Sequence, residues 1–277
     1  MIPTGRPFYK LTGSGNDFVF VDVRRDAARE LEKVETIRAV CARGSGVGAD
    51  GIVFLKGGES APISIRYLNS DGSLAALCGN ATLCATRLAV ELGMVERDRD
   101  FGIETDSGLV TARFRDGLPE IDLQPVTDVQ DCFPVELEAG EERIGFALVG
   151  VPHLVILTED VDQAPIVERG RELRHHAGLA HGANVNFVSR RNDRWRIRTY
   201  ERGVEAETLA CGTGAVATAL MLSAWGEASA TVELETRSAR SLRIRHRLDG
   251  RNHLASLSGE ARIVFVGQLA ELFSAGT

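Results

Sequence analysis

Two stretches of this 277-residue chain repeat one pattern of apolar run, turn, cysteine and helix-like segment. The first reads IRYLNSDGSLAALCGNATLCATRLAVELG, from Ile65 to Gly93. The second reads IRTYERGVEAETLACGTGAVATALMLSAWG, from Ile197 to Gly226. In both stretches the closing glycine lies 15 residues after the cysteine of a Cys-Gly pair, Cys78 in the first and Cys211 in the second. Spacing this regular indicates an internal duplication.

Each stretch predicts a strand, a turn and a helix. The runs Ile65 to Leu68 and Arg196 to Tyr200 are typical of strands, and turn residues follow both. About 13 residues after each Cys-Gly carry apolar side chains at helical spacing, and a glycine closes each segment as expected just past a helix end. The pattern therefore places Cys78 and Cys211 at helix N-termini.

Two further pairs of segments follow the same order. IETDSGLV, from Ile103 to Val110, matches LETRSARSL, from Leu234 to Leu242. GNDFVFV, from Gly15 to Val21, loosely matches GANVNFV, from Gly182 to Val188. We therefore predict two related α/β halves, residues 1–120 and 121–261. The strand-like segment near the C-terminus would let residues 262–277 return to the first half.

Composition narrows the class of protein. The chain is 44% hydrophobic and 26% charged, with a formal net charge of −7, as in soluble globular proteins. The acidic balance argues against nucleic acid or an anionic membrane as partner. No apolar run approaches the ~18 residues of a membrane span, and the first residues lack a signal pattern. We expect a cytoplasmic protein.

Several cofactor signals are weak or absent. Lysine occurs only at Lys10, Lys33 and Lys56, and none lies in a stretch resembling a pyridoxal phosphate anchor. Five cysteines without a CxxC pair indicate neither a disulfide framework nor a zinc site. The GxGxxG match at 46–51 runs into the strand-like Ile52–Leu55, whereas a dinucleotide fingerprint opens a helix. We therefore expect no cofactor and no metal, and a glycine loop that packs near the site or supports a turn.

Paired cysteines at helix ends suggest a specific chemistry. The unpaired N–H groups and the dipole at a helix N-terminus stabilise an anion, either a thiolate or a substrate carboxylate. Two related halves can bring Cys78 and Cys211 to opposite sides of one cleft. Two bases that face one carbon can remove a proton from one face and return a proton to the other. This arrangement favours racemisation or epimerisation beside a carboxylate.

The chain resembles the diaminopimelate epimerases, a family of cofactor-independent enzymes. The resemblance rests on GSGNDFVFVD (Gly13–Asp22), RGSGVGADGIV (Arg43–Val53), the segments NSDGS and LCGN within Asn69–Asn80, GANVNF (Gly182–Phe187) and YERGVEAETLACGTGA (Tyr200–Ala215). It implies two domains, each a sheet wrapped around a central helix, with the active site in the cleft between them. It also implies a homodimer that interconverts LL- and meso-diaminopimelate, a small-molecule amino acid substrate, in lysine biosynthesis.

The resemblance also implies roles for individual residues. Cys78 and Cys211 would be the catalytic acid–base pair, one a thiolate and one a thiol. The reacting amino acid centre would be surrounded by Asn16, Gly79, Asn80, Gly212 and Thr213. The distal amino acid group would be held by Asn69, Asn184, Glu201 and Arg202. An equally simple interpretation is that Asn69 and Asn184 hydrogen-bond to backbone groups of a turn or a helix cap.

Two positions depart from the family pattern. Val151 precedes Pro152-His153 where family members commonly have Asn, and Ala81 follows Gly79-Asn80 where Gly is usual. Both departures bear on substrate choice, so another cofactor-independent racemase or isomerase of the same fold remains the alternative. A Cys-His hydrolase using His153 or His181, and a binding protein for a dicarboxylic amino acid, explain the paired cysteines less well.

Overall fold

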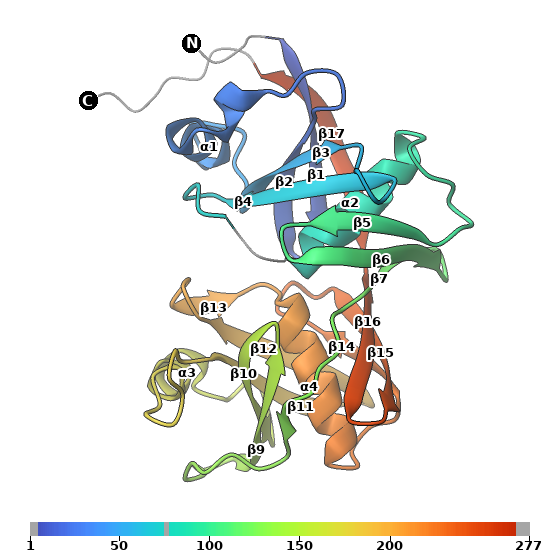
Figure 1. Cartoon of the computed structure of the whole chain (residues 1–277). Coiled ribbons are helices and arrows are strands. Elements are labelled where there is room, and N and C mark those ends of the chain that lie inside the picture. The colour runs from blue at the N-terminus through green and yellow to red at the C-terminus, as the bar shows by residue number, and fades with distance from the viewer. Residues whose placement is uncertain (1–4, 75–77, 270–277) are drawn as a thin grey trace. The chain divides into compact units, whose positions relative to one another are not determined.

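A computed structural model describes residues 5–74 and 78–269 (Figure 1). The described chain forms two compact units. The first comprises the residues up to Ile121 together with those from Glu260 onward, and the second comprises Asp122–Gly259. Each unit is a strand-rich α/β structure.

The first unit consists of eight strands, a short 3-10 helix and two α-helices. In the order in which neighbouring strands pair, the sheet contains β17 (Ala261–Leu269), β1 (Arg6–Gly13), β2 (Asn16–Asp22), β3 (Gly51–Lys56), β4 (Ile63–Asn69), β5 (Phe101–Thr105), β6 (Gly108–Arg115) and β7 (Leu118–Asp122). The helices are η1 (Arg29–Glu32), α1 (Val34–Cys41) and α2 (Gly79–Glu91). Helix α2 contacts β17, β1, β2, β4 and β6, so the sheet wraps around it.

The second unit repeats this arrangement. Its sheet contains β8 (Val129–Gln130), β9 (Glu141–Val149), β10 (Val151–Thr158), β11 (Asn184–Arg191), β12 (Arg194–Glu201), β14 (Thr231–Glu235), β15 (Ser241–Asp249) and β16 (Asn252–Gly259), and β13 (Ala206–Thr208) pairs with β12. The helices are α3 (Ile166–Arg174) and α4 (Gly212–Ala224). Helix α4 contacts β9, β10, β11, β14, β15 and β16, and is enclosed as α2 is.

Strand directions establish the duplication. In the first unit β1–β2, β3–β4, β5–β6 and β6–β7 pair antiparallel, whereas β2–β3 and β4–β5 pair parallel. The series from β9 to β16 shows the same alternation, with β10–β11 and β12–β14 as its parallel pairs. The predicted fold class, a sheet around a central helix in each of two related units, is confirmed.

One of the sequence matches is wrong. GNDFVFV lies on β2, whose counterpart in the second unit is β10, whereas GANVNFV lies on β11, the counterpart of β3. Both stretches are buried strands rich in apolar residues, a composition shared by most central strands of a sheet. The other matched pair is correct, because Ile103–Val110 and Leu234–Leu242 both span the hairpin that follows the central helix.

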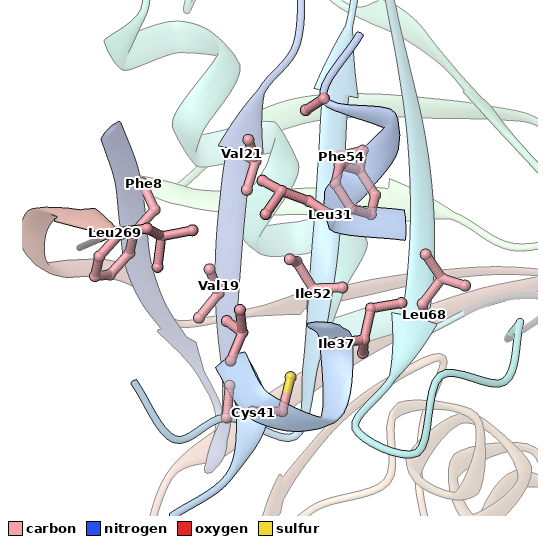
Figure 2. Close-up of a cluster of buried hydrophobic side chains, with 13 residues drawn as sticks. Phe8, Val19, Val21, Leu31, Ile37, Cys41, Ile52, Phe54, Leu68 and Leu269 are labelled. Atoms are coloured by element: carbon pink, nitrogen blue, oxygen red, sulfur yellow. The ribbon is translucent and has the colours of Figure 1, made fainter. Parts of the chain in front are cut away.

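Both faces of the central strands of the first sheet are buried. Val19, Val21, Ile52 and Phe54 point toward α1 and η1, and Figure 2 shows them packed with Ile37 and Leu31. The side chains that alternate with them, such as Phe18 and Phe20, lie on the α2 side and are also fully buried. The central strands therefore read as continuous apolar runs because helices cover both faces of the sheet.

The two central helices end in the same way. Gly93 has φ 63° and Gly226 has φ 78°, each in the left-handed region one residue beyond the helix cap. Their N–H groups bond to Val90 and Ser223, and the next residues, Met94 and Glu227, reach back to Ala89 and Leu222. This pair of backbone hydrogen bonds is the Schellman motif, and it confirms the predicted helix ends. In the described residues, no helix has the length and apolarity to cross a membrane.

Candidate active site

Each unit carries a cysteine directly before the first residue of its central helix. Cys78 is the N-cap residue of α2 and Cys211 is the N-cap residue of α4, and both are partly exposed. In α4 the Gly214 N–H points to Cys211 Sγ at 3.4 Å, and Thr213 Oγ1 lies 3.6 Å from the same sulfur. A 13-residue helix and a donated N–H both favour negative charge at this position. The predicted placement of both cysteines is confirmed.

Two other cysteines are unsuited to acid–base chemistry. Cys41 and Cys84 are buried within the first unit. Burial raises the pKa of Cys41 to about 12 and raises the pKa of Cys84 well above its ordinary value. Both thiols stay protonated at neutral pH and serve as small apolar side chains.

The first unit gathers several predicted residues at the start of α2. Asn80 follows Gly79 in the first turn, and its Nδ2 donates to Asn16 Oδ1 at 2.7 Å. Asn16 opens β2 directly after a tight turn, in which Ser14 has φ 51° and Gly15 has φ 109°. The structure therefore brings Asn16, Gly79 and Asn80 to the helix end that bears Cys78.

Close packing holds this turn against α2. A Cβ atom at Gly13 would lie 2.9 Å from Cys84 Sγ and 3.2 Å from the Asn80 carbonyl oxygen. A side chain at position 13 would therefore push β1 away from the helix. The absence of a side chain lets the β1–β2 turn reach the first turn of α2, where Asn16 meets Asn80.

Asn69 lies at the end of β4 and stabilises a turn. Its Nδ2 donates to Ser73 Oγ at 3.0 Å, and its backbone N–H donates to the Ser73 carbonyl at 2.9 Å. The side chain is partly exposed. The turn-forming reading of Asn69 is confirmed, and a substrate contact would add to it.

The second unit gathers the residues expected at the distal group. Asn184 begins β11 and is 4% exposed, and its Oδ1 accepts the backbone N–H of Arg202 at 2.8 Å. Glu201 ends β12, directly before Arg202. Asn184 thus holds the turn that follows β12 and fixes the backbone from which Glu201 and Arg202 project.

Beneath the start of α4 lies a buried polar cluster that sequence reasoning missed. Asn186 Nδ2 donates to the Leu154 carbonyl at 2.9 Å, and Asn186 Oδ1 accepts from Thr199 Oγ1 at 2.9 Å. A Cβ atom at Gly214 would lie 2.3 Å from Asn186 Oδ1, so only glycine allows this approach. Gly214, the second glycine of Cys-Gly-Thr-Gly, was the one sign of this close packing in the sequence.

A second group missed from the sequence lies behind Asn16. Asp50, at the end of the glycine-containing loop, accepts from Asn16 Nδ2 at 3.0 Å and from Arg43 at 2.8 Å. Asp17 accepts from the same Arg43 at 2.7 Å and from Lys10 at 2.7 Å. Burial alone would raise the pKa of Asp17, but the hydrogen bonds from Arg43 and Lys10 outweigh it and lower that pKa. The glycine-containing loop therefore packs against Asn16, one of the residues expected at the site.

The described chain belongs to the class of two-unit α/β proteins in which each sheet encloses a helix, here with a cysteine at the start of each enclosed helix. Two solved structures share this fold. A PhzF-family phenazine biosynthesis protein from Bacillus anthracis aligns with a TM-score of 0.72 and 14% identity, covering 96% of this chain and 99% of that chain. A hydroxyproline epimerase from Agrobacterium vitis aligns with a TM-score of 0.66 and 19% identity, covering 96% and 92%.

The chain belongs to the diaminopimelate epimerase family, whose family model matches residues 8–124 and 145–264. The diaminopimelate epimerase of Gemmatimonas aurantiaca is 46% identical over 96% of this chain and 99% of its own length. That of Aquifex aeolicus is 39% identical over 95% and 98%. The resemblance seen in the sequence is therefore confirmed, and the chain is an isomerase.

Proposed function

We propose that this chain interconverts LL- and meso-diaminopimelate, by proton transfer at one α-carbon and without a cofactor, in the biosynthesis of lysine. The observation that supports this most directly is the N-terminal cysteine on the enclosed helix of each unit, in a chain of this family. A hydrolase or a passive binding protein would have no use for the second helix-end cysteine.

In the proposed reaction Cys78 and Cys211 are the two catalytic groups. A thiolate on one face of the α-carbon takes its proton, and a thiol on the other face delivers a proton to that carbon. The thiolate becomes a thiol and the thiol becomes a thiolate, so protons and charge balance and the configuration inverts. Which cysteine acts as the base depends on the configuration of the bound substrate.

The helix ends supply the electrostatic part of the proposal. As the α-proton leaves, negative charge moves onto the substrate carboxylate. Gly79 and Asn80 begin α2, Gly212 and Thr213 begin α4, and their backbone N–H groups would donate to such a carboxylate. Preformed donors stabilise the developing charge without reorganisation, and this is how the protein would acidify an α-carbon without a metal or an imine.

The non-reacting end of the substrate is assigned to the second group of residues. Arg202 offers a planar fork that suits a carboxylate, and Glu201 offers an acceptor for an ammonium group. Asn184 contributes through the backbone of Arg202 that it holds at 2.8 Å. Asn69 completes the proposed distal set. Val151, where family members commonly have Asn, is the position at which the substrate range would differ from that of the family.

Proton NMR of the purified, reduced protein with LL-diaminopimelate in D2O, without pyridoxal phosphate, tests the function. Loss of the α-proton signal together with appearance of the meso isomer is the expected result. A folded protein that leaves the α-proton in place would contradict the proposal. Exchange of another amino acid under the same conditions would assign the same chemistry to a different substrate.

We further propose a cytoplasmic homodimer. Strand β17 exposes three consecutive apolar side chains, Val264, Phe265 and Val266, which are 50%, 46% and 59% exposed. Apolar runs of this kind on a sheet edge are typical of association surfaces. Light scattering after size exclusion is expected to give twice the chain mass, and replacement of Phe265 and Val266 by Lys to give a monomer. A monomeric wild-type protein would contradict this assembly.

A further inference from the structure

Four charged residues form a closed network behind the start of helix α2. Lys10 and Arg43 face Asp17 and Asp50, so two positive and two negative charges balance. Lys10 Nζ also donates to the Gly48 carbonyl, and its side chain is only 9% exposed. Parallel pairing of β2 with β3 sets Phe18 opposite Gly51, so the preceding residues Asp17 and Asp50 lie side by side.

Asp50 determines how the amide of Asn16 is oriented. An ionised carboxylate accepts hydrogen bonds and donates none, so the group that Asn16 presents to Asp50 Oδ2 at 3.0 Å must be its NH2. The backbone N–H of Asp17 also donates to Asp50 Oδ2, at 3.1 Å. Arg43 donates to Asp50 Oδ1 at 2.8 Å and holds the carboxylate in place.

The orientation of the Asn16 amide in turn determines the orientation of the Asn80 amide. With its NH2 turned to Asp50, Asn16 presents Oδ1 to Asn80, which donates to it from Nδ2 at 2.7 Å. The remaining oxygen of Asn80 faces away from the network. Asn80 is 2% exposed, and its Oδ1 is a buried acceptor with no partner among the residues that the structure describes. A buried acceptor of this kind is costly unless a donor reaches it.

We propose that Asp50 is a positioning residue which, through Asn16, fixes Asn80 with its oxygen turned away from Asn16, and that this oxygen receives an N–H donor of the substrate, its reacting α-ammonium group. This inference rests on the proposed function for the identity of the donor. Asp50 itself touches no reacting atom in this scheme. Its effect is to decide whether the helix end beside Cys78 presents an acceptor or a donor.

Asp50→Asn tests this role. Asparagine at position 50 can donate to Asn16, so the amides of Asn16 and Asn80 are released to turn over and present NH2 to an ammonium group. We expect kcat/KM to fall on the order of 10- to 100-fold, the effect of one hydrogen bond to a charged group. The matched control is Asp22→Asn, which removes a carboxylate at the end of β2 that is hydrogen-bonded to Arg24, and wild-type kinetics are expected there.

A reversal experiment separates positioning from simple support. In the double variant Asp50→Asn/Asn80→Asp, the chain of hydrogen bonds runs the other way, and the carboxylate at position 80 still offers an oxygen to the substrate. We expect kcat/KM of the double variant to exceed that of Asn80→Asp alone by about 10-fold, since each change compensates the other. Equal activity of the two would overturn the proposal, as would Asp50→Asn with kinetics within about twofold of wild type.

A measurement without turnover keeps the test independent of the proposed function. In 15N-labelled protein the side-chain NH2 signals of Asn16 and Asn80 should shift in Asp50→Asn and stay unchanged in Asp22→Asn. Unchanged Asn80 signals in Asp50→Asn would overturn the positioning role even if no substrate were turned over. If Asp50→Asn fails to fold, Asn80→Ala keeps the charge network, and a rise in KM for diaminopimelate is expected. An unchanged KM in that variant would overturn the role of the oxygen.

Discussion

The Nδ1 atom of His153 lies 3.2 Å from the Nδ2 atom of Asn186, and both side chains are fully buried in the second unit. The amide of Asn186 is fixed by its bonds to the Leu154 carbonyl and the Thr199 hydroxyl. Its NH2 group is therefore the donor, and His153 Nδ1 must be the acceptor. The imidazole is held neutral, with its proton on Nε2.

Nitrogen NMR is expected to find His153 in this one tautomer. In long-range 15N–1H spectra, Nε2 should carry the proton and Nδ1 should not, from about pH 5 to about pH 8. Asn186→Asp, which turns the donor into an acceptor, should move the proton to Nδ1. A mixture of tautomers in the wild-type protein would contradict the geometry. His176, partly exposed on a turn, serves as an internal reference.

His153 should make the free energy of unfolding depend on pH. Burial, and to a lesser extent the positive charge of Arg202, lower the pKa of His153 to about 3. In the unfolded chain His153 has an ordinary pKa near 6.5, so between about pH 3 and pH 6.5 it is protonated there but neutral in the folded chain. Above about pH 6.5 His153 therefore does not reduce the free energy of unfolding. Below that pH it lowers the free energy of unfolding by at most about 1.4 kcal/mol for each pH unit.

Urea unfolding at several pH values measures this dependence. The slope of unfolding free energy against pH between the two pKa values should be smaller in His153→Gln than in wild type, because the variant has no group to titrate. Equal slopes in wild type and His153→Gln would show that His153 is protonated in the folded protein.

Each helix-end cysteine should be required for turnover and neither for folding. Cys78→Ala and Cys211→Ala are each expected to lower kcat by at least about 10²-fold, the usual contribution of one acid or base. Binding of diaminopimelate, measured by calorimetry, should persist in both variants. Cys132→Ala removes an exposed thiol of the second unit and should change neither quantity. Full activity in either helix-end variant would rule out the two-cysteine mechanism.

Mild oxidation should inactivate the protein by joining Cys78 to Cys211. Diamide would take two electrons and two protons from the two thiols, form one disulfide and be reduced to the hydrazine. Peptide mapping without reductant should find the linked peptides, and dithiothreitol should restore activity. Cys41 and Cys84 are shielded by burial and a raised pKa. Inactive oxidised protein whose Cys78 and Cys211 both still react with iodoacetamide would contradict this prediction.

The glycine that ends α4 should contribute through its backbone alone. Gly226 has φ 78°, and no atom lies within 4 Å of a Cβ placed there, so Gly226→Ala adds strain without a clash. We expect a loss of about 1–2 kcal/mol in unfolding free energy. Gly57 is equally open but does not have a left-handed φ, and Gly57→Ala should be neutral or slightly stabilising. Chemical denaturation of both variants compares the two effects, and equal stabilities would show that Gly226 is not held in this conformation.

Local features of the sequence were enough to predict the two central helices and the place of the cysteines. Cys-Gly at the start, apolar residues at helical spacing and a glycine one residue past the end act over one helix, so Cys78 and Gly93 could be placed from the chain alone. The hairpin after each helix was matched correctly for the same reason. Membership of the family followed from segments that the sequence shows directly.

Only the tertiary structure decided which strands pair and which side chains meet across them. GNDFVFV and GANVNFV look alike because buried strands share an apolar composition, yet they occupy non-equivalent positions in their sheets. Likewise Asp50 reaches Asn16 across 34 positions of sequence through the parallel pairing of β2 with β3. Helix ends depend on residues that are neighbours in the sequence. Strand pairing and buried hydrogen bonds join residues that are far apart in the sequence, so no local pattern in this chain predicts them.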